Sequence, residues 1–427
     1  MDIISELDGK RILIWGYGRE GKATEHFLER CAKPASVDIF EGKREEINED
    51  AYDFIIKSPG IVMKEENPKY TSETELFLQQ FRDQVIGITG TKGKSTTSAM
   101  LYTVLKACSG RPVLLLGNIG QPCLDYFEEV TEDTIIVYEM SCHQLAHTNV
   151  SPHIAIFLNL YEEHLDYYGT VEKYFEAKSH IAAYQKNGDY FFVGENVPPI
   201  ETGAKKTVIH QPKGVHYELK LAGEHNQYDA QFVECVAELL GCKKDAVRKS
   251  MAGFEGLPHR LQYIGTYRDV SYYDDSIATI PEAAVEAALS IPNAKTILIG
   301  GMDRGINYDL LITFIREHKE LQFICAYASG KRIFEEAGDC ENCIYVEDLE
   351  QAVEAAVRMT QPGEACILSP AAASYGYLKT LRSVEMPFRS MSMLLHSKVT
   401  DFQKKTYRTE KIILRLAKAE KFLYGNR

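Results

Sequence analysis

The fold of this chain is decided by one stretch of sequence, Val85-Ile-Gly-Ile-Thr-Gly-Thr-Lys-Gly-Lys-Ser-Thr96. Its first five residues form an apolar run of strand length, and a helical pattern follows the last glycine. Glycines let the backbone turn so that successive N–H groups and the helix N-terminus face phosphate oxygens. Lys94 adds a positive charge at the β- and γ-phosphates, and the Ser95 hydroxyl can ligate Mg²⁺. The stretch predicts a nucleotide-binding loop, although Ile88 stands where the common phosphate-loop pattern has its first glycine.

A second glycine-rich turn lies near the N-terminus. Gly16-Tyr-Gly-Arg-Glu-Gly21 follows an apolar run at residues 11–15, and Glu41 follows the next run. This pattern is typical of dinucleotide-binding Rossmann turns, in which an acidic residue contacts a ribose hydroxyl. By itself the turn also fits another nucleotide or a purely structural role.

Short apolar runs alternate with longer helical patterns along the chain, which is typical of parallel α/β sheets. We expect strands near residues 11–15, 36–40, 54–56, 85–89, 113–116, 134–138, 154–158, 271–273, 296–299 and 365–368. The predicted fold class is α/β with three domains. A Rossmann-like N-terminal domain covers residues 1–75, a central phosphate-loop ATPase domain with a parallel sheet covers 76–256, and a Rossmann-like C-terminal domain covers 257–427.

Charge and composition exclude several classes of protein. The net charge of −13 argues against a general nucleic-acid binder. We expect a cytoplasmic protein without membrane insertion, because the N-terminus has no signal-peptide pattern and no apolar run approaches about 18 residues. Ten cysteines in so long a chain predict reduced thiols, and the Cys340–Cys343 pair has no second ligand pair for zinc.

The C-terminal tail differs from the rest of the chain. Residues 389–427 carry a charge of +7 and the remainder −20. Residues 411–423 predict an amphipathic helix, which we interpret as a solvated surface helix. Docking onto an acidic partner, or onto the acidic body of the chain, is the alternative.

The two glycine-rich turns, with further motifs in the same order, resemble the muramyl peptide ligases of the Mur ligase family. The resemblance runs from the first strand to about Arg382. The motifs that carry it are Gly16-Tyr17-Gly18, Lys57 to Gly60, Thr89 to Ser95, Gly117 to Gly120, Glu139 to Leu145, Asn159 to Asp166, Glu224 to Asn226, Gly256 to Arg260, Asp274 to Ser276 with Thr279, Gly300-Gly301, and Ser369 to Ala371. Within the family the chain is similar to the MurD type, which joins D-glutamate to UDP-N-acetylmuramoyl-L-alanine.

This resemblance implies an ATP-dependent carbon–nitrogen ligase of peptidoglycan precursor synthesis. Such an enzyme forms an acyl phosphate and releases ADP and phosphate. The implied cofactors are ATP and Mg²⁺, the substrates are the UDP-linked precursor and glutamate, and we expect a monomer.

The resemblance also implies roles for individual residues. It places the UDP substrate at Gly18, Glu41, Ser58, Gly60 and Asn118. It places ATP at Gly90, Thr91, Lys92, Gly93, Lys94, Ser95, Thr96, Asn226, Arg260 and Asp275. The implied magnesium ligands are Ser95, Glu139, His164 and a carbamylated Lys178, and the implied catalytic residues are Lys94, His164 and Lys178. The glutamate contacts are Thr279, Arg304, Ser374 and Tyr375.

Departures from the family pattern leave alternatives open. Asp229 stands where the family has asparagine, Ile277 and Arg304 stand where it often has lysine, and its usual ending is not recognisable after Phe388. A related ligase that adds L-glutamate, whose first glycine turn resembles this one, remains an alternative. So do a ligase for another amino acid and a non-catalytic nucleotide-binding relative.

Other readings fit the sequence less well. A folylpolyglutamate synthase would lack the N-terminal UDP domain, and a nicotinamide dehydrogenase would leave the phosphate loop without a role. The spacing of His143 and His147 suggests zinc, but we interpret this pair as structural.

Overall fold

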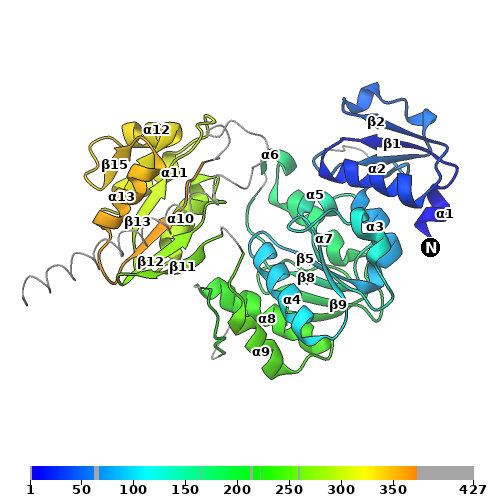
Figure 1. Ribbon diagram of the computed structural model, residues 1–427. Coiled ribbons are helices and arrows are strands. Elements are labelled where there is room, and N and C mark those ends of the chain that lie inside the picture. Colours follow the sequence, from blue (N-terminus) through cyan, green and yellow to red (C-terminus); the bar gives the residue numbers. More distant parts are fainter. Residues whose placement is uncertain are drawn as a thin grey trace, which may run out of the picture. The chain divides into compact units, whose positions relative to one another are not determined.

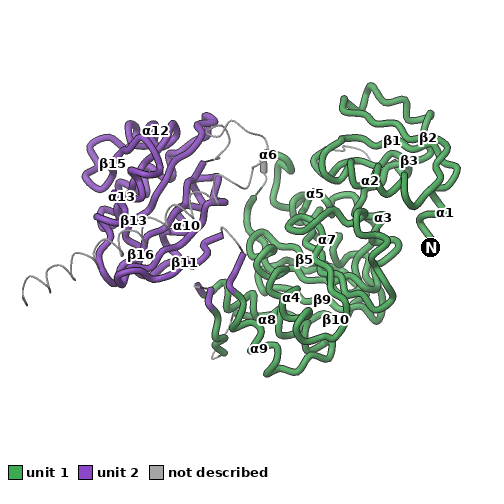
Figure 2. Tube along the Cα trace, in the orientation of Figure 1, with its two compact units in different colours: residues 1–219, 224–254 green, residues 220–223, 255–427 purple. Residues whose placement is uncertain are grey.

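The computed structural model describes residues 2–61, 67–163, 165–211, 215–221, 223–257 and 260–372. Three sheets follow one another along the chain (Figure 1). They fall into two compact units, and the first unit takes residues 1–219 and 224–254 (Figure 2). The second unit takes residues 220–223 and those from 255 on. Two of the sheets lie in the first unit and one lies in the second.

The first sheet is parallel, with strand order β2-β1-β3-β4. Its strands are β1 (Arg11–Trp15), β2 (Ser36–Phe40), β3 (Phe54–Lys57) and β4 (Tyr70–Thr71). The helices of this region are α1 (Ile3–Leu7), α2 (Arg19–Cys31), α3 (Glu73–Phe81) and the 3₁₀ turns η1 (Arg44–Glu46), η2 (Glu49–Ala51) and η3 (Arg82–Gln84). Strand β1 is buried from its second residue on because it is a central parallel strand, whereas the edge strand β2 is largely exposed.

The second sheet is also parallel, with strand order β10-β9-β8-β5-β7-β6. Its strands are β5 (Val85–Thr89), β6 (Val113–Gly117), β7 (Ile135–Glu139), β8 (Ile154–Phe157), β9 (Tyr190–Gly194) and β10 (Lys205–Ile209). Its helices are α4 (Lys94–Cys108), η4 (Leu124–Glu129), α5 (Cys142–Leu145), α6 (Leu165–Tyr168), α7 (Val171–Ala183), α8 (Glu224–Leu239) and α9 (Lys244–Gly253). Every residue of β5 is buried, and both α4 and α7 contact this strand. The phosphate-loop stretch therefore starts from the interior of the sheet.

One hydrophobic core joins the first two sheets. It contains Ile12 and Ile14 of β1, Phe27 of α2, and Tyr138 of β7. Phe27 packs on Phe127 with ring centroids 4.8 Å apart. Burial of this shared apolar surface stabilises both sheets together, which explains why they form one compact unit.

The second unit has a six-stranded sheet of order β11-β12-β16-β13-β14-β15, in which only the β11–β12 pair is antiparallel. Its strands are β11 (Gln262–Tyr267), β12 (Val270–Asp274), β13 (Ala294–Ile299), β14 (Gln322–Ala326), β15 (Cys343–Val346) and β16 (Ala365–Leu368). Its helices are α10 (Pro281–Ser290), α11 (Asp309–Glu317), α12 (Tyr327–Ala337) and α13 (Leu349–Met359). This unit has hydrophobic clusters of its own.

The predicted α/β class with parallel sheets is confirmed. The domain boundaries after residues 75 and 256 stay predictions, and the first of them falls inside α3. All ten cysteines are free thiols. Within the described part of the chain, no helix has the length and apolar character needed to cross a membrane. The basic tail lies outside the described residues.

Candidate active site

The predicted phosphate loop connects β5 to α4. Gly90 and Gly93 have φ values of +159° and +83°, and a Cβ atom on Gly93 would lie 2.6 Å from a carboxyl oxygen of Asp229. Glycine is therefore required at position 93 by both backbone and space. The N-cap of α4 is Gly93, which has no side chain to cap the helix, and the backbone N–H groups of a first helical turn suit an anion.

Asn159, which follows β8, clamps this loop from the side. Its Oδ1 accepts from the Lys92 N–H at 2.9 Å, and its Nδ2 donates to the Lys92 carbonyl at 3.1 Å. The Thr91 N–H donates to the backbone carbonyl of Asn159 at 2.9 Å. Asn159 belongs to a motif that resembles the family, but no individual role was predicted for it.

Two lysine side chains meet at the carbonyl of Gly90. Lys94 Nζ donates to Gly90 O and to Thr91 O, both at 2.9 Å. Lys178 Nζ of α7 donates to Gly90 O at 2.9 Å and to Thr89 Oγ1 at 3.3 Å. Lys178 is 1% exposed. Its burial, and then repulsion by Lys94, lowers the pKa of Lys178 to about 7.

Glu139 lies at the carboxyl end of β7 and is fully buried. Its Oε1 accepts from Asn118 Nδ2 at 2.7 Å, while its Oε2 is buried without a hydrogen-bond partner in the described structure. A buried carboxylate oxygen without a partner is costly unless a cation or donor fills the place beside it. The residue fits the predicted magnesium ligand.

The structure describes only two of the other three predicted magnesium ligands. Ser95 is buried in the first turn of α4, and Lys178 lies beside the loop. His164 lies outside the described residues. Among the residues that the structure does describe, no three His, Cys, Asp or Glu side chains gather as a metal site.

The first glycine-rich turn and the Ser58-Pro59-Gly60 loop lie side by side. Ser58 Oγ donates to Gly16 O at 2.9 Å, and a Cβ on Gly21 would lie 2.2 Å from Gly16 O. No side chain caps the N-terminus of α2 at Gly18. Backbone N–H groups at a helix end suit a diphosphate. Glu41, after β2, is exposed.

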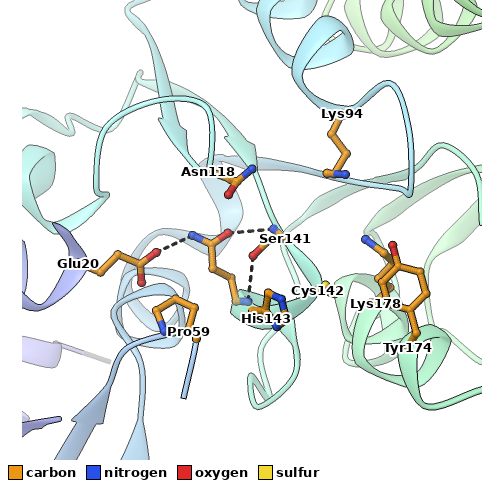
Figure 3. A pocket seen from close by; sticks show the side chains of 11 residues that line it. Glu20, Pro59, Lys94, Asn118, Ser141, Cys142, His143, Tyr174 and Lys178 are labelled. Carbon is orange, nitrogen blue, oxygen red and sulfur yellow. Dashed lines mark hydrogen bonds between the residues drawn. The ribbon is translucent and has the colours of Figure 1, made fainter. Parts of the chain in front are cut away.

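The Pro59-Gly60 loop and the start of α4 line one cavity of about 360 Å³ inside the first unit (Figure 3). Pro59 and Gly60 line it from the first sheet, and Asn118, Lys94 and Lys178 line it from the second. The remaining lining residues are Glu20, Ser141, Cys142, His143, Gln144 and Tyr174. No role was predicted for Glu20, which lies in the first glycine-rich turn, or for Gln144, which lies in the Glu139 to Leu145 motif.

Helix α8 packs against α4 and carries Asn226 and Asp229. Asn226, in its first turn, is mostly buried, with Nδ2 3.1 Å from His225 Nε2. Asp229 is buried against Gly93, and burial raises the pKa of this carboxyl well above its usual range. Asp229, which stands where the family has asparagine, therefore packs against Gly93 of the phosphate loop.

The second unit holds the remaining predicted site residues that the structure describes. Asp275, directly after β12, accepts from Ser369 Oγ at 2.7 Å and from Leu261 N at 3.0 Å. Burial raises its pKa to about 6, against the lowering effect of these bonds and of Arg260. Thr279 before α10 and Arg304 after β13 are exposed. Ser374 and Tyr375 lie outside the described residues.

The histidine pair with zinc-like spacing forms separate contacts. His143 stacks on Tyr168 with ring centroids 5.6 Å apart, and Tyr168 Oη lies 3.3 Å from His143 Nδ1. His147 is in a buried environment that lowers its pKa to about 4, with Lys57 and His180 adding to the effect.

Comparisons with known proteins agree with this arrangement. Residues 88–230 match the family model described as the Mur ligase middle domain. The UDP-N-acetylmuramoylalanine–D-glutamate ligase of Streptococcus pyogenes serotype M5 is 31% identical over 432 residues, with 88% of this chain and 95% of that protein covered. The Geobacillus kaustophilus enzyme of the same name is 30% identical over 428 residues, with 87% and 94% covered.

Solved structures agree at the level of the fold. The structure of UDP-N-acetylmuramate-alanine ligase from Thermotoga maritima superposes with a TM-score of 0.58 at 17% identity, covering 92% of this chain and 99% of that one.

Proposed function

This chain belongs to the Mur ligase family and to its D-glutamate-adding type, and from that premise we propose that it joins D-glutamate to UDP-N-acetylmuramoyl-L-alanine while ATP is split to ADP and phosphate. The product is an amide-linked peptidoglycan precursor. We further propose that the enzyme acts in the cytoplasm as a monomer.

The observation that carries this proposal is one cavity of the first unit that residues of both sheets line. Its walls include the Pro59-Gly60 loop on one side and Lys94 of the phosphate loop on the other. A ligase that phosphorylates a carboxylate must bring a uridine-linked acid and a triphosphate together in one space. A dehydrogenase would have no use for the second loop.

The alanyl carboxylate is a poor electrophile because its charge repels nucleophiles and oxide is a poor leaving group. In the proposed mechanism one carboxylate oxygen attacks the γ-phosphorus, the bond to the β-phosphate oxygen breaks, and ADP leaves. The N–H groups at the start of α4 and the Lys94 ammonium hold the phosphates in line and stabilise the charge that develops on them. The glutamate amine gives up a proton to a base, for which His164 and a nearby carboxylate are the candidates, and attacks the acyl carbon. The bond from that carbon to the phosphate oxygen breaks and phosphate leaves.

Magnesium fits this site because Glu139 offers a buried oxygen without a described partner. Glu139, Ser95, His164 and a carbamylated Lys178 would hold the ion, which when bound would neutralise phosphate charge. Carbamylation requires the neutral amine of Lys178 to attack carbon dioxide and lose a proton. The lowered pKa of about 7 supports this, since an appreciable fraction of the amine is then neutral near pH 7.

The second unit is proposed to supply the amino acid. Thr279, Arg304, Ser374 and Tyr375 would surround glutamate, with the Arg304 guanidinium able to pair with a carboxylate through two hydrogen bonds. Arg260 and Asp275 would contact ATP, and water would have to be excluded from the acyl phosphate. Ile277, which is 51% exposed, supplies no charge at a position where the family often has lysine.

A phosphate-release assay tests the function directly. Purified protein is supplied with UDP-N-acetylmuramoyl-L-alanine, ATP and Mg²⁺, with D-glutamate, L-glutamate or neither. We expect release that requires D-glutamate. Dependence on L-glutamate would support the related ligase instead, and no release with any amino acid would support a non-catalytic relative.

Lys94→Ala should lower the rate of this assay at least about 100-fold, because the charge on the transferred phosphate loses its principal cation. The matched control is Lys106→Ala, near the end of the same helix and exposed, which should behave like the wild type. Equal thermal melting of all three proteins shows that folding is intact. Retained activity in Lys94→Ala would contradict the mechanism.

A further inference from the structure

A groove lies between two helices of the second unit, α10 and α11. The helices pack against each other on one face of the sheet, where Ala284, Leu311 and Ile297 of β13 share a hydrophobic cluster (Figure 1). The groove has a volume of about 370 Å³. None of its lining residues takes part in the proposed reaction. It is lined by Val285 of α10 and by Asp309, Leu310, Thr313, Phe314 and Glu317 of α11.

Apolar side chains in and beside this groove are open to solvent. Leu289, one helical turn after Val285, is 63% exposed, and Leu310 is 51% exposed. Residues four apart lie on the same face of a helix, so Leu289 extends the apolar stripe of Val285 along α10. Single exposed leucines are ordinary on protein surfaces, but two beside one groove indicate a place where another chain segment packs.

The two helices that form the groove are acidic. They carry Glu282, Glu286, Asp309 and Glu317 against one basic residue, Arg316. The guanidinium of Arg316 donates to two backbone carbonyls at the end of α12, so its charge is held there. Glu282 stands one helical turn before the apolar stripe of α10, and Glu317 lines the groove itself. The surface therefore suits a segment that is apolar on one face and basic beside it.

A segment with this chemistry is present in the chain itself. Residues 411–423, Lys-Ile-Ile-Leu-Arg-Leu-Ala-Lys-Ala-Glu-Lys-Phe-Leu, lie outside the described residues and contain four basic residues against one acid. At helical spacing, Ile412, Leu416, Ala419 and Leu423 fall on one face. A helix of about this length is only marginally stable alone in water, so it needs a surface on which to bury that face.

The chain is long enough to place this segment in the groove. The described residues end at Ala372, shortly after β16, and 38 residues separate Ala372 from Lys411. A flexible chain of that length spans roughly 30 Å on average. Strand β16 lies between β12 and β13, and the helices that follow those two strands are α10 and α11. The groove is therefore within reach from inside the second unit.

We propose that residues 411–423 form a helix that docks in the groove between α10 and α11 of the same chain. Its apolar face would cover Val285 and Leu289, and its basic residues would lie beside Glu282 and Glu317. Of the interpretations of the basic tail that the sequence left open, this one is docking onto the acidic body of the chain. The inference goes beyond the proposed function and does not depend on it.

Hydrogen exchange of the full-length protein, followed by mass spectrometry, tests the docking. Residues 411–423 should exchange at least about tenfold more slowly than an unstructured chain, because an undocked helix of this length opens readily. Leu416→Asp should remove this protection, since it places a charge on the apolar face. Leu414→Asp is the matched control, because the same change falls on the opposite face of the helix and should leave the protection in place.

Charge reversal in the groove distinguishes this surface from others. Glu282→Lys combined with Glu317→Lys should also abolish the protection of residues 411–423. Glu350→Lys combined with Glu354→Lys makes the same change of charge on α13, which packs on the opposite face of the sheet. This control should keep the protection. Thermal melting shows whether each variant is folded.

Photo-crosslinking tests the location directly. Benzoylphenylalanine in place of Thr313, an exposed residue of the groove, should crosslink to residues 411–423 within a single chain. The same group in place of Glu354 should not. A product with the mass of two chains would assign the groove to a second copy and overturn the inference. Rapid exchange of residues 411–423 in folded wild-type protein, or protection that survives the reversal in the groove, would overturn it as well.

Discussion

Lys94 and Lys178 both donate to the Gly90 carbonyl, and two ammonium groups so close repel each other. Lys178 is the more buried of the two, and its burial together with the charge of Lys94 lowers its pKa to about 7. A folded-state pKa below the ordinary lysine value means that the charged form is disfavoured in the fold. Conversion to a carbamate would replace repulsion by attraction toward Lys94.

We therefore expect Lys178 to take up carbon dioxide. Protein equilibrated with ¹³C-bicarbonate should give a carbamate carbon signal in the NMR spectrum that is absent from Lys178→Ala. The signal should weaken as the pH falls below about 7, because protonation removes the reactive amine. Lys173→Ala, an exposed lysine on the same helix, should keep the signal. A spectrum of Lys178→Ala that is identical to the wild type would contradict the assignment.

At the scale of the elements, Asp189 connects the start of β8 and the start of β9 to η3 through its hydrogen bonds. Arg82 Nη2 donates to Asp189 Oδ2 at 2.5 Å, His153 Nδ1 lies 2.7 Å from Oδ1, and the Lys186 N–H donates to Oδ2 at 2.7 Å. Burial alone would raise the pKa of Asp189, but these hydrogen bonds and the Arg82 charge outweigh it, and the pKa is lowered. The element ends are thus held by an ionised carboxylate.

Asp189→Asn should lower the free energy of unfolding by about 3 kcal/mol, because the mostly buried Arg82 would lose its buried anion and keep only the exposed Asp83. Asp83→Asn is the matched control, since Asp83 pairs with the same arginine but its side chain is 82% exposed. It should cost about 0.5 kcal/mol or less. Chemical denaturation at pH 7 measures both.

The Asp189 contribution should also depend on pH in a defined direction. A carboxyl whose pKa is lowered in the fold stabilises it above the unfolded pKa of about 4, and this stabilisation disappears as the pH falls through the folded value. The difference between wild type and Asp189→Asn should therefore shrink in acid. A difference that stays constant down to about pH 2 would show that the charge is not its cause.

At the scale of the whole molecule, each compact unit has its own hydrophobic clusters. One core spans the first two sheets, and the second unit has its own clusters. The residues proposed to bind the uridine substrate lie in the first unit, as does the phosphate loop. Thr279 and Arg304 lie in the second unit. Binding of the uridine substrate and amide formation should therefore be separable.

We expect a fragment of residues 1–254 to melt cooperatively and to bind UDP-N-acetylmuramoyl-L-alanine about as tightly as the full chain. It should release no phosphate with glutamate, since the residues proposed to hold the amino acid are missing. Calorimetry and the phosphate assay test both statements. Turnover by the fragment would remove the second unit from the mechanism, and an unfolded fragment would show that the two units depend on each other.

The sequence alone determined ten of the sixteen strands in the described residues, the glycine-rich stretch after β5 and the family, but it missed β4, β9, β10, β11, β14 and β15. Each of these depends on residues close together in the chain, such as the apolar run of β5, the glycines after it and Lys94. Local pattern is sufficient for them because strand burial and helix N-termini arise within a few residues. The same reasoning placed Glu139 at a strand end, where the structure has it.

Only the tertiary structure decided which of these distant segments contact one another. Glu20 and Gln144 are 124 positions apart and meet in one hydrogen bond, and Lys178 and Gly90 are 88 apart. The pKa of Lys178, the packing of Asp229 against Gly93 and the common core of the first two sheets all depend on burial. Burial is set by which distant segments cover a residue, and no local pattern in the chain encodes that.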